Sequence, residues 1–228
     1  MKKIVSIFLI LIVAIFTLTG CSNQEQEPSL EDKNIAELEY IEERLIEILN
    51  KLVKDEYIED EVFNWENLLA DTRKIEDVLA VTLVDLASLN IQADEISKLS
   101  NGIDNMIISA DKRDERAYII ELNNVYALIP TYMERYTNKN AVAFKKRLKY
   151  YTISSYIAYA DNNLEMSKTQ VSELDRVYNE KMQQVEYVQE NEYNMNKIYV
   201  LIQELKKAIE SDSSELVKSK YLLLIDEI

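Results

Sequence analysis

The residue types that usually carry enzyme chemistry are almost absent from this chain. Its 228 residues include one cysteine, Cys21, and no histidine. The common zinc sites need Cys or His ligands, and Ser-His-Asp or Cys-His catalysis needs an imidazole. Gly102 is the only glycine after residue 20, which excludes phosphate-binding loops of the Walker type and the dinucleotide fingerprint. We therefore expect a protein that is not an enzyme and that holds no cofactor.

Acidic pairs are the remaining candidates for metal or acid–base chemistry. They lie near predicted turns and lack the spaced loop and central glycine of an EF-hand. A di-metal helical bundle needs Glu-x-x-His pairs, which the chain cannot supply. The sequence therefore predicts no metal site at these pairs, which are Asp94 with Glu95, Asp111 with Asp114 and Glu115, and Asp212 with Glu215.

The N-terminal segment has a recognisable order of residue types. Two lysines precede an almost wholly apolar run over 4–18, and a polar stretch starts at Ser22. This order is typical of a secretory signal with a small-residue cleavage site. The run is about fifteen residues long, whereas a spanning helix needs about twenty. An uncleaved membrane anchor is the alternative interpretation.

The ending Leu18-Thr19-Gly20-Cys21 resembles the lipobox of bacterial lipoproteins, and the resemblance covers residues 1–21 only. It implies that residues 1–20 are a signal peptide removed by cleavage. It also implies that the Cys21 thiol carries lipid, so that membrane lipid is a partner and the protein is anchored at the extracytoplasmic face of the cell membrane. Residues 21–33 are then the lipidated cysteine and a flexible acidic tether, and 34–228 form the folded domain.

A basic, tyrosine-rich segment stands out in a chain whose formal net charge is −15. No acid occurs between Glu134 and Asp161, whereas residues 24–61 are strongly acidic. One interpretation is an internal partner for the acidic first helix. The other is a surface for an anionic wall polymer, a lipid headgroup or a membrane protein; the net charge argues against nucleic acid. The candidate surface comprises Arg135, Lys139, Lys145, Lys146, Arg147, Lys149, Tyr150 and Tyr151.

Apolar residues recur at helical spacing along most of the chain. Leu38, Ile41, Leu45, Ile48 and Leu52 alternate steps of three and four residues, which predicts a helix over 34–56. Similar patterns predict helices over 65–89, 96–110, 119–136, 195–209 and 214–227, and one or two helices over 141–190. The scarcity of Gly and Pro, two of each, disfavours a sheet.

These patterns predict an all-α bundle of long amphipathic helices, with an extended coiled coil as the alternative. No exact sequence repeat is found. Asp161-Asn162-Asn163 is a possible joint within 141–190, Gly102 marks a close helix approach or a break, and Pro130 kinks or ends its helix. The favoured function is non-enzymatic binding or scaffolding. The alternative is a sensor or accessory subunit that docks a membrane protein complex through an apolar helical surface such as Tyr221 to Ile225.

Overall fold

The computed structural model describes residues 30–59, 62–88, 91–135, 140–183 and 185–228. These residues form eight α-helices, and their only strands are the two short strands of one antiparallel β-hairpin. The predicted all-α fold is therefore confirmed. The elements are α2 (Leu30–Val53), β1 (Ile58–Glu59), β2 (Val62–Phe63), α3 (Trp65–Ser88), α4 (Ala93–Asp111), α5 (Glu115–Met133), α6 (Asn140–Ala160), α7 (Leu164–Met182), α8 (Val185–Glu210) and α9 (Ser214–Glu227).

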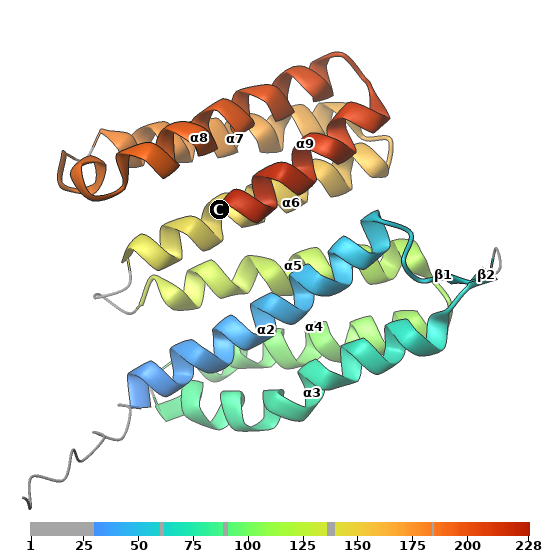
Figure 1. Ribbon diagram of the computed structural model, residues 1–228. Helices are drawn as coiled ribbons and strands as arrows, with labels where there is room; N and C mark the ends of the chain where they lie inside the picture. The colour runs from blue at the N-terminus through green and yellow to red at the C-terminus, as the bar shows by residue number, and fades with distance from the viewer. Residues whose placement is uncertain (1–29, 60–61, 89–90, 136–139, 184) are drawn as a thin grey trace, which may run out of the picture.

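The helices form two four-helix bundles in which the order of neighbouring helices is the same (Figure 1). Each helix packs against the next one along the chain. In addition, α2 packs against α5 and α6 packs against α9, so that α2–α5 close one bundle and α6–α9 close a second. The two bundles meet where α5 packs against α6, a contact that we call the seam. The bundle that the apolar patterns predict is therefore confirmed.

The described residues form four consecutive helical hairpins, and the first helix of each ends in the same left-handed turn, which we call the tip. The tips hold Asp55, Arg113, Asn162 and Asp212, which have left-handed backbone angles with φ between 51° and 61°. Arg113, Asn162 and Asp212 follow one another at intervals of 49 and 50 residues. In the last three hairpins the next residue is the N-cap of the returning helix, and the side chains of Asp114 and Asn163 accept from the backbone N–H three residues on. All four tips lie at the same end of the molecule (Figure 1).

The buried positions of the first helix recur in every hairpin. The residues fourteen, ten and seven positions before each tip residue are all buried. The first hairpin contributes Ile41, Leu45 and Ile48, the second Leu99, Ile103 and Met106, the third Leu148, Thr152 and Ser155, and the fourth Ile198, Ile202 and Leu205. The molecule is thus a fourfold structural repeat in which the pattern of burial recurs although the residues differ.

The helix boundaries differ from the sequence-based expectation in three places. The segment 141–190 holds α6 and α7, which meet at the expected joint, 161–163, but it also holds the start of α8, which begins at Val185 and not at 195. The first helix begins at Leu30, inside the stretch expected to be a tether. The first helix ends at Val53 and not at 56, and the chain then forms the β1–β2 hairpin, in which Ile58 pairs with Phe63 and Phe63 packs on Trp65 with ring centroids 4.4 Å apart.

The C-terminal run Tyr221 to Ile225 is mostly interior. Tyr221 and Leu224 are fully buried and Ile225 is nearly so, whereas Leu223 is 50% exposed. The Tyr221 ring stacks on Tyr156 of α6 at 4.4 Å between centroids. This run therefore closes the second bundle and does not present a continuous apolar stripe.

Gly102 lies inside α4 at a close helix approach, and the alternative of a local break is wrong. A Cβ atom there would stand 2.5 Å from Cγ2 of Val125 on α5. Pro130 does not end α5 at once, since the helix continues to Met133.

We expect Gly102→Ala to lower the free energy of unfolding by about 1 kcal/mol. Overpacking costs about 1–3 kcal/mol, and this outweighs the roughly 1 kcal/mol that alanine gains over glycine within a helix. Urea unfolding followed by circular dichroism measures the change. In a Val125→Ala background the same substitution should instead stabilise the protein, and stabilisation in the wild-type background would show that the contact is not tight.

Candidate functional site

Of the residues singled out from the sequence, Lys139 and the N-terminal segment up to Cys21 lie outside the described residues. The others can be placed, and most of them lie near the seam between the two bundles. The seam has two chemically distinct regions. One is a buried charged cluster between α2, α5 and α6, and the other is an open groove between α5, α6 and α7.

The charged cluster is built around Glu42 of α2, which is 1% exposed. Its carboxylate forms an ion pair with Lys146 of α6, and Nζ of Lys149 lies 4.0 Å from Oε1. The Tyr126 hydroxyl of α5 donates to the same Oε1 at 2.6 Å. One buried carboxylate thus joins three helices and both bundles.

Burial controls the titration of the groups around Glu42. It lowers the pKa of Lys149, although the nearby Glu42 carboxylate opposes that shift. Burial also raises the pKa of the Tyr126 hydroxyl well above its ordinary value, and Glu42 adds to the effect. Tyr126 therefore remains a hydrogen-bond donor across the physiological pH range, and the cluster acts as a structural contact between the bundles.

The remaining residues of the predicted anion-binding surface are distributed over several contacts. Arg135 meets Glu95 of α4 at 2.6 Å, and Arg147 meets Glu134 just beyond the end of α5 at 2.6 Å. Lys145 is half-buried and forms no ion pair with a described residue. The rings of Tyr150 and Tyr151 are half-buried against the core, with centroids 5.1 Å apart.

Of the two interpretations of the basic segment, an internal partner for the acidic first helix fits Lys146 and Lys149. Both of these side chains lie beside the carboxylate of Glu42 on that helix. Sequence reasoning did not identify that carboxylate. A signal was present, because Glu42 lies four residues after Leu38 and three before Leu45, on the apolar face of its helix. A charged residue on a buried face needs a partner, and only a basic segment elsewhere in the chain could supply it.

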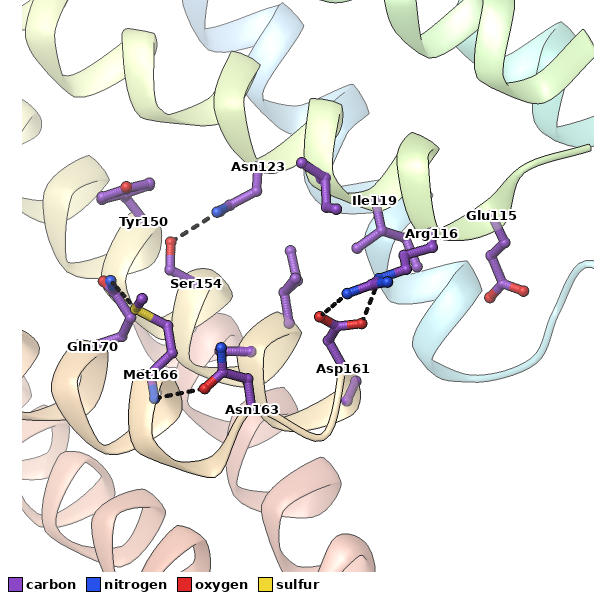
Figure 2. Close-up of a pocket in the computed structure, with 14 residues that line it drawn as sticks. Glu115, Arg116, Ile119, Asn123, Tyr150, Ser154, Asp161, Asn163, Met166 and Gln170 are labelled. Atoms are coloured by element: carbon purple, nitrogen blue, oxygen red, sulfur yellow. Dashed lines mark hydrogen bonds and ion pairs between the residues drawn. The ribbon is translucent and has the colours of Figure 1, made fainter. Parts of the chain in front are cut away.

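The groove is lined by residues of α5, α6 and α7 and of the turn between α6 and α7 (Figure 2). Its volume is about 710 Å³, which falls within the range of small-ligand sites, roughly 300–1,000 Å³. Two of its apolar side chains are widely exposed, Ile120 at 44% and Met166 at 46%. The apolar lining comprises Ile119, Ile120, Ile157, Ala158, Ala160 and Met166.

Three helices place polar groups in the groove (Figure 2). Ser154 of α6 donates to Oδ1 of Asn123 on α5 at 2.9 Å. Gln170 of α7 donates through Nε2 to the Met166 sulfur at 3.6 Å, and its Oε1 is buried without a partner among the described residues. At one end Arg116 and Asp161 form an ion pair at 2.7 Å. This arrangement can bind an apolar molecule and hydrogen-bond to it, and it contains no nucleophile with an adjacent base.

Of the described residues of the predicted candidate surface, only Tyr150 lines the groove, together with Asp161 and Asn163 of the predicted joint. Sequence reasoning missed Asn123, Ser154 and Gln170, because their sequence signal is weak. The run Thr152-Ile153-Ser154-Ser155 places small polar side chains on a helix whose counterparts in the other hairpins carry Ile, Leu and Met at the repeat positions. Such a run within a core helix is a hint of close packing or of a polar site. Nothing in the sequence indicates which other helices face it.

Several of the acidic residues considered for metal binding have structural roles. Asp114 caps α5, Glu95 pairs with Arg135, and Asp212 accepts from the Tyr159 hydroxyl at 3.0 Å. Within the described part of the chain, no three Asp, Glu, Cys or His residues are grouped as a metal site would require. No helix among the described residues is long and apolar enough to span a membrane.

Comparison of the chain with protein-family models, with curated proteins and with solved structures finds no match.

Proposed function

We propose that this chain is a non-enzymatic binding or scaffolding protein, attached through lipidated Cys21 to the extracytoplasmic face of a bacterial membrane. The observation that carries the binding role is the array of four helical hairpins with equivalent buried positions. Arrays of stacked helical hairpins bury a continuous core and leave extended surfaces on which other molecules bind. The lipobox-like ending before Cys21 supports the location.

The charges of the basic segment favour an internal role over a wall-polymer or headgroup surface. Arg135, Lys146 and Arg147 each already meet a carboxylate of the same chain. An external anion would have to replace these contacts. The binding surface is therefore better sought on other parts of the array.

The location is tested by replacing the thiol that would carry the lipid. In a bacterial host fed an alkyne-labelled fatty acid, the wild-type chain should take up label and sediment with membranes. Cys21→Ser should lose the label completely because serine offers no thiol to the lipidating enzyme. Ser22→Ala is the matched control and should behave as wild type. Equal labelling of wild type and Cys21→Ser would rule out the anchor.

An accessory subunit of a membrane protein complex is the second candidate. Val81 and Val84 favour it, because they are 48% and 69% exposed, lie three residues apart on α3 and so share one helix face. Crosslinking in intact cells separates the two candidates. A scaffold for wall or lipid components should yield those components, whereas an accessory subunit should yield one membrane protein in constant proportion.

A further inference from the structure

The outer face of the last hairpin, formed by α8 and α9, carries large aliphatic side chains that are exposed to solvent. Val200 of α8 is 57% exposed, and Leu223 of α9 is 50% exposed. Leu216, two helical turns before Leu223, is 48% exposed. Because α8 packs on α7 and α9 packs on α6, this face looks away from the core of the second bundle (Figure 1).

Two ion pairs between the helices flank these aliphatic side chains. Lys197 of α8 pairs with Glu227 of α9, and Lys220 of α9 lies 3.5 Å from Glu204 of α8. On each helix the exposed aliphatic residue follows a lysine by three positions and precedes a glutamate by four, so all three share one side of their helix. The α8–α9 face, as we call this surface, comprises Lys197, Val200, Glu204, Lys220, Leu223 and Glu227.

The charges of the α8–α9 face alternate in sign. The two helices run in opposite directions, so the pattern that they share places each lysine beside the glutamate of the other helix. The four charges therefore form an alternating square around Val200 and Leu223, and they sum to zero.

An alternating square of charges is complementary to a second copy of itself. If the second copy is turned by half a turn about an axis that lies in the face, every lysine comes to stand opposite a glutamate. An axis across the helices brings Lys197 opposite Glu204 of the second copy, and an axis along the helices brings it opposite Glu227. In both arrangements aliphatic side chains meet at the centre, as a symmetric interface requires.

We propose that the α8–α9 face binds the same face of a second copy of this chain and so forms a symmetric dimer. The chain as a whole has a formal net charge of −15, which keeps two copies apart elsewhere, whereas this face is locally neutral. An anionic membrane or wall polymer would meet Glu204 and Glu227, and a basic partner would meet the lysines. This inference goes beyond the proposed binding role and does not depend on the anchor at Cys21.

The ion pairs within the chain leave these side chains available to a second copy. Lys197 is 54% exposed and Glu204 is 37% exposed, and pairs at such positions contribute little to folding. The face is nevertheless small, since α9 has 14 residues and is about 21 Å long. Small interfaces are typical of weak, transient complexes, so we expect a reversible dimer.

The test reverses the charges of the α8–α9 face in the full chain. Lys197→Glu with Lys220→Glu makes all four charges negative, and Glu204→Lys with Glu227→Lys makes all four positive. Each protein is purified in a nonionic detergent, and its mass is measured by sedimentation velocity over a range of concentrations. We expect the wild type to dimerise, each variant alone to remain monomeric, and an equimolar mixture of the two variants to dimerise again.

A second pair of variants tests the centre of the face without changing its charge. Val200→Gln with Leu223→Gln replaces two exposed side chains and should raise the dissociation constant of the dimer at least about tenfold. Val81→Gln with Val84→Gln is the matched control, because these valines of α3 are 48% and 69% exposed and lie outside the α8–α9 face. The control should dimerise as the wild type does.

Thermal unfolding of each variant separates lost association from lost folding, and the glutamine variants decide alone if a charge variant does not fold. A wild type that remains monomeric at every concentration overturns the proposal. It is also overturned if the two folded charge variants fail to associate with each other, or if Val200→Gln with Leu223→Gln affects the dimer no more than the α3 control. None of these outcomes bears on lipidation, which is read separately from the Cys21→Ser labelling experiment.

Discussion

Replacing Glu42 with alanine is expected to lower the free energy of unfolding by about 3–5 kcal/mol, the usual cost of removing one partner of a buried ion pair. The change leaves Lys146 and Lys149, whose side chains are 14% and 19% exposed, beside each other without a carboxylate. It also removes the acceptor of the buried Tyr126 hydroxyl. Urea unfolding followed by circular dichroism measures the loss.

Controls for this prediction come from the same helix and from the partner lysine. Glu43→Ala alters the neighbouring exposed carboxylate and should change stability by no more than about 0.5 kcal/mol. Combining Glu42→Leu with Lys146→Met should restore much of the loss, because apolar pairs of similar volume often replace buried ion pairs without cost. If Glu42→Ala and Glu43→Ala had equal effects, Glu42 would not be the contact that joins the two bundles.

The second large effect is expected for Tyr221→Ala, which should cost about 3–5 kcal/mol, as for other large aromatic residues truncated in a core. Tyr221 stacks on Tyr156 of α6, and its hydroxyl lies 3.4 Å from Oδ1 of Asn50 on α2. The substitution therefore loosens α9 from α6 in its own bundle and from α2 in the other bundle. Differential scanning calorimetry should show a lower unfolding temperature and enthalpy.

Leu223→Ala is the matched control for Tyr221→Ala, because it truncates a large apolar side chain on the same helix at a position that is 50% exposed. It should cost less than about 1 kcal/mol. Tyr221→Phe isolates the hydroxyl and should also cost about 1 kcal/mol or less. If Leu223→Ala were as damaging as Tyr221→Ala, α9 would be packed through its outer face, contrary to the burial of Tyr221.

Most of the fold was predictable because its determinants are local. The alternation Leu38, Ile41, Leu45, Ile48 marks the buried face of α2, and Asp161-Asn162-Asn163 marks a hairpin tip, since Asn and Asp tolerate left-handed angles and cap helices. The fourfold repeat was not predictable by matching residues. Only the pattern of burial recurs, because different apolar residues can fill equivalent buried positions. Ile41, Leu148 and Ile198 do so in three of the hairpins.

The candidate site depends on tertiary packing, so most of it could not be predicted from the sequence. The acidic stretch 24–61 offers many carboxylates, and only the packing of α2 on α5 and α6 selects Glu42 as the partner of Lys146. The groove likewise arises from three helices, and Asn123, Ser154 and Gln170 are separated in sequence. Their proximity follows from the packing of α5 and α7 against α6, which no local pattern encodes.

The hairpin tips have a consequence for how far the protein reaches. All four tips lie at one end of the molecule, whereas α2 begins at the opposite end (Figure 1). The nine residues from Cys21 to Leu30 can extend at most about 30 Å, and the 24 residues of α2 add about 36 Å. Under the proposed attachment at Cys21, the start of α2 therefore stays within about 30 Å of the membrane, and the tips at Asp55, Arg113, Asn162 and Asp212 lie at the end of the domain farthest from the start of α2.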